Sequence, residues 1–155
     1  MSRYRLVNCD FCNSSAFTKL SSGAKMLYYS ILLNADDIGF IDSVEDLIKR
    51  DGLNNQASEE LVLKGLLLHF NNHHGDSVYL VKHWFMHNKW KDRLYSRYYK
   101  LLTENNLKAK SGKYVKVDPK QQAQEEDKKL TLVESEDTDA EFENMSDQWE
   151  LPFDR

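Results

Sequence analysis

The feature that most constrains the fold is a change in the period of the apolar residues near position 78. Upstream of it, apolar residues recur at the helical spacing of three and four. Residues 78–85 instead alternate imperfectly and are rich in β-branched and aromatic side chains, which is typical of a strand. The pattern therefore predicts a set of helices followed by a small β element.

Three helices are predicted before this change. The first spans residues 21–34, where serines precede apolar residues at helical spacing. A tight turn with a short extended piece is expected in 35–42, because two aspartates and a glycine surround isolated apolar residues. Ser43 resembles the start of a capping box for a short helix that Gly52 ends, and a third helix is expected over residues 58–70.

Helical spacing returns over residues 93–105, and 113–117 is a candidate second strand. The order helix, short extended piece, helix, helix, strand is that of a winged helix-turn-helix module. The predicted fold class is therefore mainly α with a small β element, a winged helix-turn-helix, in residues 1–117. A disordered acidic tail is expected in 118–155.

The charges are unevenly distributed, which the net charge of -4 conceals. Lys and Arg against Asp and Glu number 7 and 10 in residues 1–81, 10 and 2 in 82–117, and 4 and 13 in 118–155, so the balance is -3, then +8, then -9. A segment of +8 favours a polyanionic ligand, whereas an acidic segment with few large apolar groups is typical of a solvated tail. A solvated basic face without a ligand is the alternative interpretation.

The basic residues are densest in residues 82–100, with tyrosines between them. Trp84 follows the predicted strand and is expected in the core, whereas the remaining donors favour phosphate contacts with some base stacking. The predicted nucleic-acid-binding residues are Lys82, His83, His87, Asn88, Lys89, Lys91, Arg93, Arg97 and Lys100. Lys64 is added as the only strong base of helix 58–70, whose leucine-rich body predicts weak sequence specificity, a structural role or a protein interface.

No metal, cofactor or catalytic site is predicted. His83 and His87 would share a face only on a helix, and His83 falls in the predicted strand. Cys9 and Cys12 have no second cysteine pair that would complete a zinc site. The sequence contains no Gly-rich phosphate loop, nucleophile elbow or His-Glu-x-x-His motif, so it is not expected to be an enzyme.

The sequence also predicts no contact with a membrane. No apolar run approaches the ~20 residues needed to cross a bilayer, and the N-terminus has no signal-peptide pattern. We therefore expect a cytoplasmic protein.

Two motifs resemble a known family. Ala35-Asp-Asp-Ile-Gly-Phe40 and His83-Trp-Phe-Met-His-Asn-Lys-Trp-Lys-Asp-Arg93 occur in this order, after Phe17-Thr-Lys-Leu20. Together they look like the N-terminal domain of phage replisome-organiser (replication initiation) proteins of Gram-positive bacteria, which is similar to DnaD-like winged-helix domains. The resemblance covers about residues 11–100. The sequence departs from the family pattern at Leu94, where Tyr is common.

The resemblance implies a role in starting phage DNA replication in the cytoplasm of a bacterial host cell. It implies binding to duplex or single-stranded DNA. It also implies recruitment of a host helicase, a helicase loader or a single-stranded-DNA-binding protein. The sequence is compatible with a monomer or a homo-oligomer.

The acidic tail offers a different class of function. Composition shifts at Pro119, and residues 134–147 are acid-rich with little periodic apolar content. Its end distantly resembles the acidic Pro-Phe tip of bacterial single-stranded-DNA-binding proteins, which docks replication partners. Trp149, Leu151 and Phe153 are therefore the predicted partner-binding residues. The alternative function is a DNA-independent adaptor or an inhibitor of a host protein, and a solubilising extension is the simplest interpretation of the tail.

Overall fold

The computed structural model describes residues 4–89 and 94–118. They belong to the first of two units into which the chain divides, Met1–Asp118, and the second unit is Pro119–Arg155. The predicted acidic tail with Trp149, Leu151 and Phe153 therefore lies outside the described residues, as do Lys91 and Arg93.

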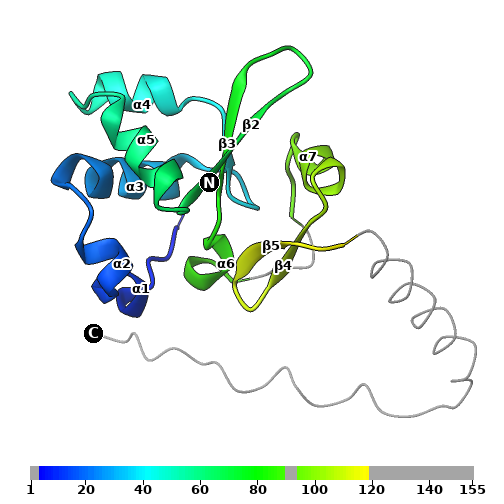
Figure 1. The fold of residues 1–155 in the computed structure, drawn as a ribbon, viewed down its shortest axis with the longest axis horizontal. Helices are drawn as coiled ribbons and strands as arrows, with labels where there is room; N and C mark the ends of the chain where they lie inside the picture. Colours follow the sequence, from blue (N-terminus) through cyan, green and yellow to red (C-terminus); the bar gives the residue numbers. More distant parts are fainter. Residues whose placement is uncertain (1–3, 90–93, 119–155) are drawn as a thin grey trace, which may run out of the picture. The chain divides into compact units, whose positions relative to one another are not determined.

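The described residues form short helices, a three-stranded antiparallel sheet and a separate two-stranded hairpin (Figure 1). The helices are α1 (Cys9–Asn13), α2 (Ser15–Thr18), α3 (Ser22–Asn34), α4 (Val44–Arg50), α5 (Gln56–Leu63), α6 (Trp84–His87) and α7 (Tyr99–Glu104). The strands are β1 (Phe40–Ile41), β2 (Leu67–Asn71), β3 (Ser77–Val81), β4 (Leu107–Lys110) and β5 (Lys113–Lys116). The prediction of a helical chain with a small β element is confirmed at this coarse level.

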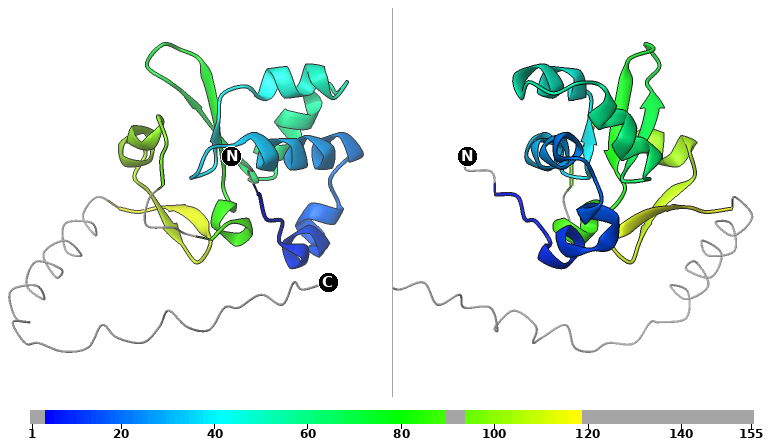
Figure 2. Two further views of the ribbon diagram at one scale, coloured as in Figure 1. Left: turned by 180° about the vertical axis from the view of Figure 1, so that it is seen from behind. Right: turned by 60° about the vertical axis from the view of Figure 1, so that its left-hand side comes forward.

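The first sheet has the order β1-β3-β2, with β3 in the centre. Leu80 of β3 lies opposite Phe40 on one side and Leu68 on the other. The hairpin of β2 and β3 extends past β1, and α3, α4 and α5 lie together on one side of it (Figure 1, Figure 2). None of the helices in the described part of the chain has the length and apolar character needed to cross a bilayer.

The core lies between these helices and the sheet. It contains the fully buried side chains Leu27, Tyr28 and Ile31 of α3 together with Leu61 of α5. Trp84 is also fully buried, which confirms its predicted place in the core. Burial of such apolar side chains is the main source of stability for a domain of this size.

The helix α3, the turn with β1 and the short helix α4 are confirmed, but Ser43 does not cap α4. Ser43 has φ -106° and ψ 32° and its side chain makes no capping hydrogen bond. A capping side chain needs an extended backbone at this residue, which these angles do not provide. The helix is instead favoured by Glu45 and Asp46 in its first turn and by Lys49 and Arg50 in its last.

The predicted helix 58–70 is wrong in its second half. Helix α5 stops at Leu63, and Gly65 has φ +71°, a left-handed backbone that ends helices and favours glycine. The chain then enters β2, which pairs with β3 along its whole length. A short leucine run such as 66–68 has no period that separates a buried strand from a helix.

The predicted strand 78–85 and the predicted helix 93–105 are both too long. Strand β3 ends at Val81, and Trp84 and Phe85 lie in α6. In the described part of the second segment, residues 94–105, only Tyr99–Glu104 is helical. The predicted strand 113–117 is present as β5, but its partner β4 was not expected.

Candidate nucleic-acid interface

Residues 35–40 and 83–88, which carry the family resemblance, are in contact. The indole Nε1–H of Trp84 donates a hydrogen bond to the carbonyl oxygen of Asp37 at 2.9 Å. Gly39 has φ +96°, and a Cβ atom at this residue would lie only 2.8 Å from Cγ of Trp84. Glycine is therefore needed at position 39 for two reasons, the backbone angle and the close approach of the indole.

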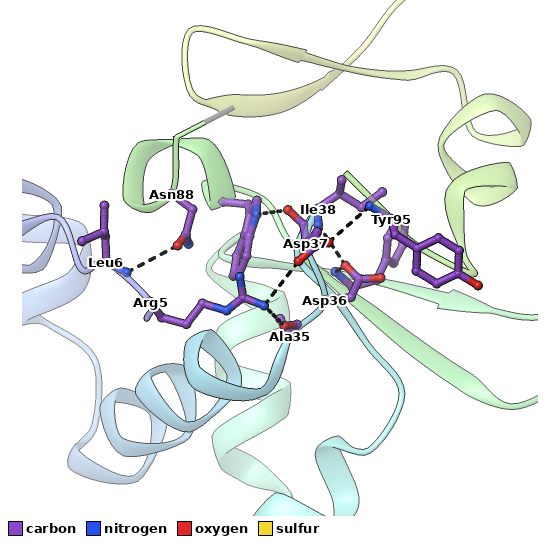
Figure 3. Close-up of polar contacts among 10 residues, drawn as sticks. Arg5, Leu6, Ala35, Asp36, Asp37, Ile38, Asn88 and Tyr95 are labelled. Carbon is purple, nitrogen blue, oxygen red and sulfur yellow. Dashed lines mark hydrogen bonds and ion pairs between the residues drawn. The ribbon is translucent and has the colours of Figure 1, made fainter. Parts of the chain in front are cut away.

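Arg5 closes this contact from the N-terminal segment. Its guanidinium carbon lies 5.1 Å from the centroid of the Trp84 ring, within the range of a cation–π interaction. The same guanidinium donates to the carbonyl oxygen of Ala35 at 2.8 Å and lies 3.9 Å from the carboxylate of Asp37 (Figure 3). Residues from two other, distant parts of the chain thus fix one turn.

The two aspartates of the turn 35–40 have structural partners. An Asp36 carboxylate oxygen accepts hydrogen bonds from the backbone N–H groups of Ile38 at 3.1 Å and Phe40 at 2.9 Å. Burial raises the pKa of Asp36, against the lowering effect of these hydrogen bonds. An Asp37 carboxylate oxygen accepts from the backbone N–H of Tyr95 at 3.3 Å (Figure 3). Both side chains therefore stabilise the turn.

His87 was predicted to contact nucleic acid, and this prediction is wrong. The residue is only 4% exposed. Its Nδ1 accepts a hydrogen bond from the backbone N–H of Asn8 at 2.9 Å, and its Nε2 lies 3.0 Å from the hydroxyl oxygen of Tyr28. Burial lowers the pKa of His87 to about 4, so the ring is neutral near pH 7. With both nitrogens engaged inside the fold, His87 has no atom left for a phosphate.

Two neighbours of His87 are also partly structural. The Asn88 side-chain oxygen accepts from the backbone N–H of Leu6 at 3.4 Å, which ties it to the N-terminal segment (Figure 3). The half-buried His83 ring lies 5.0 Å from that of Phe11. Burial, followed by the charges of Lys82 and Lys113, lowers the pKa of His83 to about 4. A neutral imidazole contributes no charge to a nucleic-acid interface.

The hairpin of β4 and β5 brings together lysines that were not among the predicted site residues. Lys110 lies opposite Lys113, and Lys108 lies opposite Val115. Because side chains alternate along a strand, Lys108, Lys110 and Lys113 share one face of the hairpin, whereas the buried Leu107 and Tyr114 belong to the other. The sequence carries a signal for this arrangement in residues 108–113, where lysines alternate before a Ser-Gly turn.

Lys82 adjoins this hairpin. Its carbonyl oxygen accepts a hydrogen bond from the backbone N–H of Tyr114 at 2.8 Å. Lys82 and Lys113 are both close enough to His83 for their charges to lower its pKa, after the larger effect of burial. We call the four residues Lys82, Lys108, Lys110 and Lys113 the lysine face.

The other predicted cations are placed elsewhere. Arg97 precedes α7, with its guanidinium 4.0 Å from the carboxylate of Asp42 and 5.7 Å from the centroid of the Tyr98 ring. Lys100 is exposed in α7, and Lys89 is exposed after α6. Lys64 follows the end of α5, where its charge helps lower the pKa of the Glu60 carboxyl, after hydrogen bonds from Ser21.

Helix α5 has few groups that could bind a phosphate. Its exposed positions include Gln56, Glu59 and Leu63, and Leu63 is 84% exposed. An acidic and apolar surface repels a polyanion and offers little to base edges. The basic surface of the domain is therefore separate from α5.

The cysteines do not form part of a metal site in the described residues. Cys9 is exposed and Cys12 is half-buried, and both are free thiols. Residues 4–89 and 94–118 contain no group of three or more His, Cys, Asp or Glu side chains arranged to hold a metal ion. His83 precedes α6 and His87 ends it, so the expectation that His83 lies in a strand is wrong.

Comparison with known proteins finds no match: no family model, no curated protein and no solved structure is significantly similar to this chain. Its function is therefore inferred from the geometry of its own side chains.

Proposed function

We propose that residues 1–117 are a winged-helix domain that binds the backbone of a nucleic acid through the lysine face. The order of α3, β1, α4, α5, β2 and β3, together with the strand order β1-β3-β2, supports the winged-helix assignment. In this assignment the hairpin of β2 and β3 is the wing, and α5 occupies the place of the recognition helix.

The observation that carries the proposal is the common orientation of the hairpin lysines. Neighbouring side chains on one face of a hairpin are ~5–7 Å apart, so several ammonium groups can reach one stretch of phosphates. Lys82, Lys110 and Lys113 form no ion pair with another described residue. Their charge is therefore available to a polyanion, which binds with release of its counterions.

The proposed mode of binding has weak sequence specificity. Lysines contact phosphates as flexible point charges, whereas base edges are distinguished by polar side chains that enter a groove. Helix α5 exposes Glu59 and Leu63 where such side chains would be needed. The domain is thus proposed to bind backbone rather than to recognise one sequence.

The proposed biological role is in the initiation of phage DNA replication, with recruitment of replication partners. This part rests on the two resemblance motifs. Asp37, Gly39, Trp84 and His87 of these motifs serve the fold, so the resemblance supports a shared fold more directly than a shared ligand. The alternative role, a DNA-independent adaptor or inhibitor, is supported by the charge of -9 in residues 118–155 and by the apolar residues near its end.

A salt titration tests the binding proposal. The triple variant Lys82→Ala, Lys110→Ala, Lys113→Ala should weaken binding to all DNA sequences alike and flatten the dependence of log K on log salt by ~0.9 per lost duplex phosphate contact. The matched control is Lys19→Ala, Lys49→Ala, Lys116→Ala, which removes the same charge from exposed residues outside the lysine face. An equal change of slope in both variants would show that net charge, rather than the lysine face, governs binding.

A further inference from the structure

We infer that Tyr95 and Tyr99 form a base-stacking site, which makes single-stranded nucleic acid the preferred ligand of this domain. The inference rests on the proposed function, because phosphate contacts of the lysine face supply the general affinity for nucleic acid. It adds to that function the class of nucleic acid that is bound and the two residues that distinguish a single strand from a duplex.

The first observation is the exposure of the two tyrosine rings. The exposed fraction is 76% for Tyr95 and 60% for Tyr99. Aromatic side chains gain more than most from burial, yet these two gain little from the fold. Exposed aromatic rings among cations are the usual platform for unpaired bases, because each base has a π-face that can stack.

The second observation is that the segment carrying these rings is fixed. Tyr98, between them, is turned inward: its ring lies 5.8 Å from that of Phe40, and its hydroxyl donates to the carboxylate of Asp42. The backbone N–H of Tyr95 donates to Asp37, and the ring of Tyr95 extends away from Asp36 and Asp37 (Figure 3). The inward anchors leave the flanking rings directed outward, so little ordering is needed when a base stacks on them.

The third observation is the charge around the rings. Arg97 lies between the two tyrosines in sequence, with its side chain 73% exposed and its guanidinium 4.0 Å from the carboxylate of Asp42, and the exposed Lys100 directly follows Tyr99. The carboxylate of Glu104, at the other end of α7, lies 3.3 Å from the imidazole of His73. An aromatic surface for a protein partner would not require flanking cations, so this composition favours a nucleic acid.

The tyrosines also lie close to the hairpin of β4 and β5. Helix α7 packs on β4, and Tyr99 is close enough to Tyr114 to contribute to raising its pKa, after the larger effects of burial and of the Asp36 charge. Tyr114 lies in β5, directly after Lys113. The Tyr114 side chain belongs to the face of the hairpin opposite the hairpin lysines, so a strand whose bases stack on the tyrosines can place its phosphates on Arg97 and Lys100 of the same segment. In a duplex the faces of the bases are covered by their neighbours, and only the phosphate contacts remain.

The test compares three ligands with equal numbers of phosphates: an oligothymidine strand of ~20 nucleotides, an abasic strand of the same length and a duplex. The full chain carries either Tyr95→Leu with Tyr99→Leu, which removes both rings, or Tyr95→Phe with Tyr99→Phe, which retains them. We expect the wild type to prefer oligothymidine to the abasic strand. The leucine variant should bind oligothymidine at least ~5-fold more weakly per lost ring and bind the abasic strand unchanged, and the phenylalanine variant should behave as the wild type.

The outcomes separate this inference from the proposed function. Equal wild-type affinity for the abasic strand and oligothymidine would overturn the stacking site and leave backbone binding intact. A leucine variant that loses affinity equally for both strands would overturn it as well. Binding to none of the three ligands would overturn the proposed function and this inference together. Equal urea midpoints of the variants and the wild type check that the fold is unchanged, as expected for exposed side chains.

Discussion

Replacing Gly39 by Ala should destabilise the domain far more than the addition of one methyl group normally does. Two separate costs apply. An L-residue at φ +96° costs ~1–2 kcal/mol because its Cβ approaches the backbone. The new Cβ would also lie 2.8–2.9 Å from Cγ, Cβ and Cδ2 of the fully buried Trp84, and forcing a packed core to shift costs ~1–3 kcal/mol. The total loss in the free energy of unfolding is ~2–5 kcal/mol, against a typical total of ~5–15 kcal/mol for a protein domain.

Gly75 provides a matched control for the backbone cost. It has φ +85°, close to that of Gly39, but a Cβ atom there meets no other atom within 4 Å. Gly75→Ala should therefore lose only the backbone contribution of ~1–2 kcal/mol. The difference between the two variants isolates the contact with the indole.

Urea unfolding followed by far-ultraviolet circular dichroism measures both losses without relying on the tryptophan signal. The same two glycine substitutions made in the Trp84→Leu background complete a double-mutant cycle, because the smaller side chain leaves room for the alanine at position 39. There Gly39→Ala should cost no more than Gly75→Ala. Equal losses for the two glycine variants in the wild-type background would refute the contact between residue 39 and the indole.

Three further predictions concern pH, α5 and the acidic tail. The pKa of His87 is about 4 in the fold against 6.5 in the unfolded chain, so the unfolded state binds more protons between pH 4 and pH 6.5. Stability should therefore fall as the pH decreases from 6.5 to 4, and the urea midpoint of His87→Gln should fall less steeply than that of the wild type over this range. Lys64→Ala should leave the affinity for DNA within about twofold, since α5 is outside the lysine face; a flatter salt dependence would instead place α5 in the interface. Deleting residues 125–155 should tighten DNA binding, most at low salt, because a segment with a charge of -9 competes for the lysines; equal affinities of the two chains at low salt would contradict this competition.

Much of the fold follows from local patterns in the sequence. Helix α3 is long enough for its apolar period to be unambiguous, and the Asp-rich turn before Phe40 uses residues whose turn chemistry is local. Strand β2 could not be distinguished from a continued helix, because Leu66, Leu67 and Leu68 satisfy both patterns. There the backbone of Gly65 and the pairing with β3 decide the outcome, and pairing is a long-range property.

In the candidate site, too, some features follow from the local sequence and others only from long-range structure. Segment charge identifies the basic part of the chain, but it does not say which side chains point outward. His87 and Lys82 lie in one basic stretch, yet one is buried between Asn8 and Tyr28 and the other adjoins the hairpin. The lysines of β4 and β5 become one group only through the register of the hairpin, which fixes the side chains that share a face.

The turn 35–40 cannot make all of its contacts until residues far downstream in the chain have been synthesised. It is synthesised early, but the Trp84 indole, the Tyr95 amide and the Tyr114 hydroxyl, which donates to the carbonyl oxygen of Ile38 at 2.7 Å, all come later. Ile38 and Tyr114 are 76 residues apart, so at ~5–20 residues per second a ribosome needs ~4–15 s to supply the last of these groups. During that interval apolar residues that the finished domain buries stay exposed to water, and such surface is what chaperones bind. A nascent chain arrested before Tyr114 should therefore be degraded faster than the finished one.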